Sequence, residues 1–181
     1  MFMPPVTQVL VVALMVTAAI YDIRFRRIPN WLTLPTLPLG LALNAFLYGW
    51  RGLALAGIGV GLAILIYLPL YMLRGMGGGD LKLAVGLGAL VGWFEFFWIF
   101  VLAGVLGGVI AIVLLLARGR MRKTFSNTIY ILWELAHLRP PYRSKSDELD
   151  IGGARAYNMP HGAVLALGAL LLVGWRAFGP R

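Results

Sequence analysis

The chain has 181 residues, of which 60% are hydrophobic and only 13% are charged, and it contains no cysteine. With a mean hydropathy of +0.84, the composition excludes a soluble globular domain and indicates a polytopic membrane protein. The lack of cysteine excludes thiol catalysis, cysteine-ligated zinc and disulfides. The formal net charge of +9 does not indicate nucleic-acid binding, because the basic residues lie in short loops between apolar runs, as in membrane proteins.

In chain order, the apolar runs predict about six transmembrane helices, roughly over residues 6–21, 31–48, 53–73, 83–91, 96–117 and 160–178. The apolar stretch 83–117 is too long for one crossing, so we expect a hairpin near residues 92–95, with Glu95 in the outer turn. Apolar residues at helical spacing after Thr124 predict an amphipathic helix on the inner membrane face, inside a polar cytoplasmic loop of about 124–158.

These elements predict an all-α fold: a polytopic membrane helical bundle with about six transmembrane helices and one cytoplasmic amphipathic helix. We expect residues 1–181 to form a single integral membrane domain. Apart from Lys82, the loops at 22–30 and 118–123 and the later polar loop hold most of the lysines and arginines. The positive-inside rule therefore predicts that both termini lie outside and that Asp22 and Asp80 lie at the cytoplasmic ends of their helices.

The most unusual stretch of the sequence is Gly75–Lys82, where four glycines in five residues precede Asp80 between two apolar runs. A carboxylate inside a membrane helix costs about 2.5–3.5 kcal/mol at the helix centre and less near an end, so its presence indicates a function. The glycines allow unusual backbone angles and close approach, which predicts a hinge beside Asp80.

Asp22 is the natural partner of Asp80, because both are predicted at the same membrane depth. Asp80 shares a helix face with Ala84, Gly88 and Gly92, and small residues also lie above Asp22, so both faces suit close helix contact. If the helices pack on these faces, the two carboxyls hold a water between them, one protonated and one ionised. The ionised carboxylate then acts as general base on the water, and the protonated one polarises a scissile carbonyl.

Each aspartate alone also has a structural interpretation. Asp22 could pair with Arg24 or Arg26, and Asp80 could cap a helix while Lys82 extends to the headgroups. The pair at one depth beside a glycine hinge favours a catalytic function. The alternative from another class is a non-enzymatic membrane bundle, a transporter or a component of secretion or pilus assembly, with a structural or proton-relay aspartate pair.

Three motifs, in residues 21–24, 27–30 and 77–82, together resemble those of the type IV prepilin peptidases. These are intramembrane aspartyl proteases with an aspartate after the first span and a Gly-x-Gly-Asp motif, and a weaker similarity follows in residues 157–163, where His161 replaces the usual aromatic residue. The resemblance implies that Asp22 and Asp80 are catalytic. It also implies supporting motif positions at Gly77, Gly79, Lys82, Arg24, Pro29 and Asn30.

The resemblance further implies cleavage of the basic leader from a prepilin at the cytoplasmic face of a bacterial inner membrane. The chain is similar to the short members found with Flp/Tad pili, so no N-methyltransferase activity is expected. We expect no cofactor, no metal and no nucleic-acid partner; the expected partners are a prepilin-like membrane substrate and the lipid bilayer. Archaeal preflagellin-type and presenilin-like proteases share the Gly-x-Gly-Asp motif, but the small size and residues 28–30 favour the prepilin type.

Overall fold

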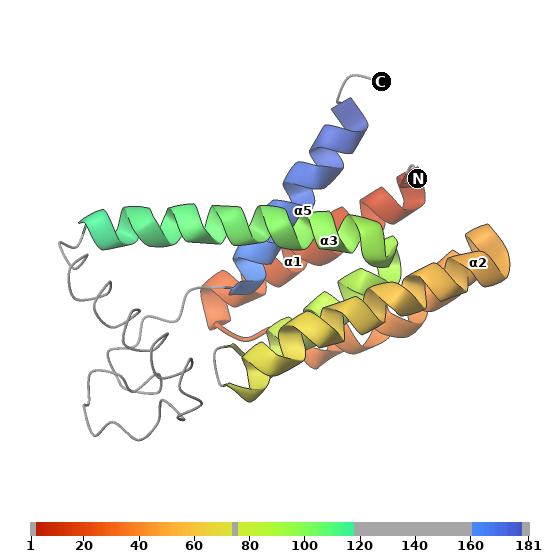
Figure 1. Cartoon of the computed structure of the whole chain (residues 1–181), viewed down its shortest axis with the longest axis horizontal. Coiled ribbons are helices and arrows are strands. Elements are labelled where there is room, and N and C mark those ends of the chain that lie inside the picture. The colour runs from red at the N-terminus through yellow and green to blue at the C-terminus, as the bar shows by residue number, and fades with distance from the viewer. Residues whose placement is uncertain (1–2, 74–75, 118–160, 179–181) are drawn as a thin grey trace, which may run out of the picture. The chain divides into compact units, whose positions relative to one another are not determined.

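A computed structural model describes residues 3–73, 76–117 and 161–178. This part of the chain forms four helices and no strand: α1 (Pro5–Phe25), α2 (Asn30–Met72), α3 (Gly78–Ala117) and α5 (His161–Phe178) (Figure 1). The predicted all-α class is therefore confirmed for these residues. The first three helices are long and apolar enough to cross a membrane, and α5 is apolar but shorter. These helices indicate a membrane protein.

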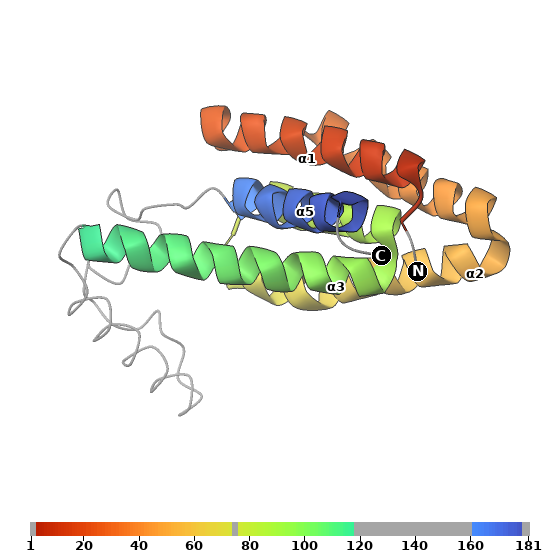
Figure 2. The ribbon, with the colours of Figure 1, turned by 90° about the horizontal axis from the view of Figure 1, so that it is seen from above.

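The described residues form four helices where about six were predicted, because two of the four each consist of two helical segments joined at a single glycine. α2 covers the second and third predicted spans, and α3 covers the fourth and fifth. Inside them, Gly49 (φ 62°, ψ −147°) and Gly92 (φ 76°, ψ 175°) are non-helical. Glycine adopts a positive φ at little steric cost, so the chain reverses at one residue without an intervening loop. Figures 1 and 2 show this reversal in both helices.

The predicted amphipathic helix and the polar loop at 124–158 lie outside the described residues. The chain divides into two compact units, Met1–Gly107 with Pro160–Arg181, and Gly108–Met159. Of the second unit the structure describes only residues 108–117, the end of α3. The helix packing and the candidate site lie within the first unit. A single domain over residues 1–181 stays a prediction.

In the first unit, α5 packs along α1, and Figure 2 shows α5 between α1 and α3. Gly168 allows α5 to approach α3 closely, because a Cβ built on it would lie 2.8 Å from the Ala103 nitrogen and 2.9 Å from the Ile99 oxygen of α3. α5 is therefore part of the interior of the bundle. The largest fully buried apolar side chains are those of Phe96, Met15, Leu83, Leu87, Ile99 and Val11.

The first part of α3 packs against α2 through small residues. Gly88 lies so close to Gly59 of α2 that a Cβ on either residue would overlap the backbone oxygen of the other. Gly40 meets α3 in the same way, with an added Cβ 2.7 Å from the Ala89 carbonyl carbon. The predicted stripe of small residues in α3 is thus a close-packing face at Gly88, although its partner there is α2 rather than α1.

Asn44 stabilises the ends of the helical segments on either side of this contact. Its Nδ2 atom donates to the carbonyls of Gly40 at 3.0 Å, Ala89 at 2.9 Å and Leu90 at 3.0 Å. The last two carbonyls would normally bond to amides one turn later, but the non-helical Gly92 interrupts that pattern. The amide therefore satisfies buried acceptors that the reversal of α3 leaves open.

Candidate active site

Asp22 lies near the end of α1 and is buried, with 6% of its surface exposed. Its Oδ2 atom accepts a hydrogen bond of 3.1 Å from the backbone N–H of Ala163, which is the third residue of α5. The first N–H groups of a helix have no partner within it and carry a partial positive charge, so a carboxylate there is stabilised. The end of α1 is fixed just beyond Asp22, since Arg26 adopts the left-handed conformation (φ 54°) and its N–H bonds to the Asp22 carbonyl.

Asp80 is the third residue of α3, directly after the glycine-rich stretch. Its Oδ2 atom accepts a hydrogen bond of 3.3 Å from the backbone N–H of Gly77, the residue before the helix. A carboxylate that reaches back to the N–H before its own helix is half of a capping box, so one Asp80 oxygen has a structural role. The other oxygen, Oδ1, is buried and has no hydrogen-bond partner in the described part of the chain.

The two carboxyl groups meet at Gly162, the second residue of α5. A Cβ built on Gly162 would lie 3.1 Å from Asp22 Oδ2 and 3.2 Å from Asp80 Oδ1. Because both oxygens lie this close to one point, their separation cannot exceed the sum of these two distances. The unpartnered oxygen of Asp80 and the oxygen of Asp22 thus lie beside the same small residue, where an added methyl would crowd both of them. This upper limit is compatible with a water that bridges the two carboxyls.

Ile28 closes the site on the side of the loop between α1 and α2. Its side chain is buried, and its Cδ1 atom would lie 2.7 Å from a Cβ on Gly162. A Cβ on Gly79 would lie 3.2 Å from Ile28 Cβ. Gly79, within the first turn of α3, therefore gives the loop room to approach the two carboxyls.

The other predicted motif residues surround this centre. Lys82 Nζ donates to Asn30 Oδ1 at 2.9 Å, a bond that joins the first turn of α3 to the start of α2. The Pro29 carbonyl accepts the N–H groups of the third and fourth residues of α2. The side chain of Arg24 is exposed, and its guanidinium lies 5.6 Å from the ring centroid of Phe25. The Lys82–Asn30 bond and the Pro29 carbonyl hold the start of α2 beside α3, whereas Arg24 contacts its neighbour Phe25.

Two contributors to the site were not predicted from the sequence as site residues: Gly162 and the Ala163 N–H. The available signals were the weaker motif similarity in residues 157–163, which contains both residues, and Pro160, since proline is common at helix starts. His161, which begins α5, is exposed and lies within electrostatic reach of Asp80. Among the described residues, no three His, Asp or Glu side chains gather in a way that could hold a metal ion.

Residues 9–112 match the model of the type IV leader peptidase family. The matched region contains both aspartates and the glycine-rich stretch, whereas α5 lies beyond it. Comparisons with curated proteins and with solved structures gave no match. The family match covers more than half of the chain, and we conclude that this membrane protein belongs to the type IV leader peptidase family.

Proposed function

We propose that this chain is an intramembrane aspartyl endopeptidase in which Asp22 and Asp80 are the catalytic pair. The observation that carries the proposal is the convergence of the two carboxyls on Gly162. Family membership supports a peptidase in general, and the pair supplies the two groups that aspartyl proteolysis needs, one base and one acid.

The reaction proceeds through a water held between the two carboxyls. The ionised aspartate removes a proton from this water, whose oxygen attacks the carbonyl carbon of the scissile peptide bond. The protonated aspartate gives its proton to the carbonyl oxygen, which yields a neutral tetrahedral diol. Collapse of the diol breaks the C–N bond as a proton moves to the leaving nitrogen, and the pair returns to its starting state. Asp80 Oδ1, buried and without a partner among the described residues, is the position for the shared proton.

The substrate in this proposal is a type IV, Flp-like prepilin, which loses its basic leader peptide at the cytoplasmic face of the bacterial inner membrane. Both aspartates lie at helix ends, near Arg24 in the last turn of α1 and the following loop that carries Arg26 and Arg27. The positive-inside rule assigns this loop to the cytoplasm and both termini to the outside. A basic loop does not attract a basic leader, so its partner is the anionic lipid surface.

The remaining motif positions support the pair. Gly77 donates its N–H to Asp80, Gly79 makes room for the loop between α1 and α2, and the Lys82–Asn30 bond holds the start of α2 beside α3. Arg24 lies in the last turn of α1, and Pro29 caps the start of α2 at the end of the loop that follows. The proposal includes no cofactor and no N-methyltransferase step.

The test is co-expression of the full chain with a candidate Flp-like prepilin, followed by mass spectrometry of the pilin N-terminus. Asp22→Asn and Asp80→Asn should each lower cleavage by at least about 100-fold while the protein accumulates normally in the membrane. The matched control is Asp147→Asn, the same change in the predicted polar loop, which should cleave at the wild-type rate. Cleavage by either site variant at more than a tenth of the wild-type rate would contradict the aspartyl mechanism. The result would then favour the alternative of a non-enzymatic membrane bundle.

A further inference from the structure

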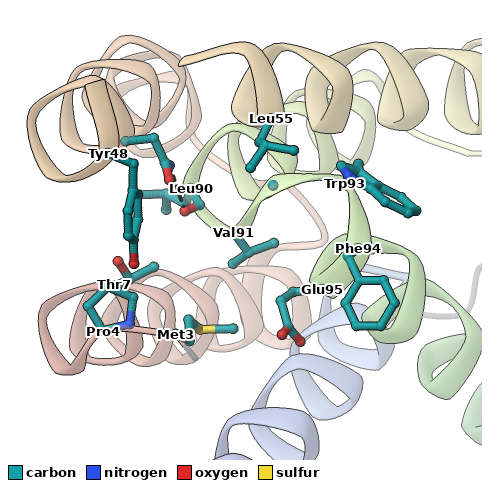
Figure 3. Close-up of a pocket in the computed structure, with 12 residues that line it drawn as sticks. Met3, Pro4, Thr7, Tyr48, Leu55, Leu90, Val91, Trp93, Phe94 and Glu95 are labelled. Atoms are coloured by element: carbon teal, nitrogen blue, oxygen red, sulfur yellow. Dashed lines mark hydrogen bonds between the residues drawn. The ribbon is translucent and has the colours of Figure 1, made fainter. Parts of the chain in front are cut away.

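The space between the two carboxyls is closed in this structure. Only 6% of the surface of Asp22 is exposed, and the Oδ1 atom of Asp80 is buried. Three cavities in the described part of the chain, of about 300, 300 and 590 Å³, are lined by neither aspartate. The one in Figure 3 includes Pro4 at the start of α1, which is about 20 Å or more from Asp22 at about 1.5 Å per helical residue. These cavities give a peptide bond no route to the two carboxyl oxygens, so the proposed reaction requires part of the chain to move.

Ile28 is the apolar side chain that lies against this space. Its Cβ atom would lie 3.2 Å from a Cβ on Gly79, and its Cδ1 atom would lie 2.7 Å from a Cβ on Gly162. The side chain therefore fills the gap between the first turns of α3 and α5. The same point beside Gly162 is 3.1 Å from Asp22 Oδ2 and 3.2 Å from Asp80 Oδ1. Ile28 Cδ1 is thus a near neighbour of both oxygens, in the space that a scissile peptide bond would have to enter.

The segment that carries Ile28 is held less firmly than the helix ends around it. The two aspartates accept hydrogen bonds from backbone amides at the starts of α5 and α3. Ile28 instead belongs to the connection 26–29 between α1 and α2, where Arg26 and Arg27 before it are exposed and Ile28 itself is buried. Its side chain makes apolar contacts only, so it can withdraw without the loss of a hydrogen bond. Segments with few buried contacts open at low free energy.

We propose that the connection 26–29 is a gate, and that the withdrawal of Ile28 from between Gly79 and Gly162 admits the scissile peptide bond to the two carboxyls. The structure is then the closed form of the enzyme. A substrate favours the open form because it contacts the carboxyls only there, and this difference in affinity shifts the population of the gate. The inference rests on the proposed peptidase activity, since a purely structural aspartate pair has no need to open.

Because the chain has no cysteine, one introduced thiol reports the position of the gate. In the full chain in proteoliposomes, the thiol of Ile28→Cys should react slowly with a water-soluble maleimide. In an Asp80→Asn background, which binds a candidate Flp-like prepilin without cleaving it, addition of the prepilin should raise this rate about tenfold. Arg27→Cys, the exposed neighbour, should react rapidly with and without prepilin. Val11→Cys, buried in α1 with 0% exposed, should react slowly in both cases.

A second measurement needs no substrate. Dicyclohexylcarbodiimide, an apolar reagent, forms an adduct with protonated carboxyls, and mass spectrometry of the digested full chain locates the adduct. Ile28→Ala removes the side chain that blocks the pair and should raise the labelling of Asp22 or Asp80 several-fold. Val11→Ala shortens another buried side chain, about 16 Å along α1 from Asp22, and its labelling should stay at the wild-type level.

The outcomes distinguish the gate from the proposed activity. If the wild type cleaves the prepilin but the Ile28→Cys thiol reacts equally slowly with and without it, the gate is refuted and the peptidase stands. Equal labelling of the wild type and Ile28→Ala also refutes the gate, because Ile28 then does not block the carboxyls. Equal increases in Ile28→Ala and Val11→Ala would show a general loosening of the bundle and contradict a specific role of Ile28. If Asp22→Asn or Asp80→Asn cleaves normally, the proposed function fails and the gate fails with it.

Discussion

Replacement of Gly162 by alanine tests whether the two carboxyls share one small space. The added methyl would lie 3.1 Å from Asp22 Oδ2, 3.2 Å from Asp80 Oδ1 and 2.7 Å from Ile28 Cδ1. Ordinary van der Waals contacts begin near 3.4 Å, so both oxygens must retreat by a few tenths of an ångström. The methyl also occupies the position where the attacking water would lie.

The expected effect on cleavage is large, and the effect on stability is moderate. Misplacement of reacting groups by about 1 Å lowers a reaction rate about 100-fold. The added methyl both displaces the carboxylates and excludes water, so we expect the cleavage rate to fall by at least that factor. Overpacking of this kind costs about 1–3 kcal/mol of folding free energy, and less if the flexible end of Ile28 moves aside. The assay is the initial rate of prepilin cleavage in proteoliposomes, with thermal unfolding in detergent measured in parallel.

Two variants distinguish a loss of activity caused by the contacts with the carboxylates from one caused by lower stability. Gly174→Ala changes another glycine of α5 at a position where an added Cβ meets nothing within 4 Å, and it should cleave normally. Gly162→Ala combined with Ile28→Val removes the contact with Cδ1 but leaves both carboxylate contacts, so it should regain stability without regaining activity. Cleavage by Gly162→Ala within about twofold of the wild type would refute the shared space, as would rescue of activity by Ile28→Val.

Two further predictions concern the fold. Asn44→Leu leaves two buried backbone carbonyls of α3, those of Ala89 and Leu90, without their donor. We expect a loss of about 2–4 kcal/mol in thermal or denaturant unfolding, and a loss below about 1 kcal/mol would contradict this role. Gly88→Ala places a methyl against the backbone of Gly59 and should prevent stable folding, judged by gel filtration in detergent. Gly57→Ala, with open space around it, is the matched control, and equal behaviour of the two variants would refute the close contact.

The helical class and the places of chain reversal could be predicted from the sequence. Apolar runs located the spans, and the hairpin expected at 92–95 coincides with the non-helical Gly92. The spans predicted over 31–48 and 53–73 likewise end and begin beside the non-helical Gly49. That each reversal takes place at a single glycine, without an intervening loop, could not be predicted, because hydropathy does not report a positive φ.

The candidate site could be predicted in part. Two aspartates at one membrane depth and a glycine-rich motif were enough to bring Asp22 and Asp80 together. The contribution of α5 was indicated only by the weaker motif similarity in residues 157–163, which assigns no role to the Ala163 N–H, a backbone group 141 positions from Asp22. Any residue except proline has a backbone N–H, so the residue type at position 163 does not indicate that its N–H is a hydrogen-bond donor to Asp22. Glu95 was expected simply in an outer turn, and its burial became clear only with Arg176, 81 positions away.

The two buried carboxylate sites of this bundle differ in the groups that hold them, and this difference bears on function. Glu95 contacts a full positive charge on Arg176, an arrangement that fixes both side chains and suits a structural or binding role. Asp22 and Asp80 accept hydrogen bonds from backbone amides at two helix starts. An amide orients a carboxylate through a partial charge and exchanges no proton with it. The Oδ1 atom of Asp80 makes no direct hydrogen bond of ordinary geometry among the described residues, although the Gly162 N–H acts on the same carboxyl. A carboxyl oxygen that is not held firmly by a donor can accept and release a proton. The helix start of α5 therefore belongs to the proposed catalytic centre as much as the two aspartates do.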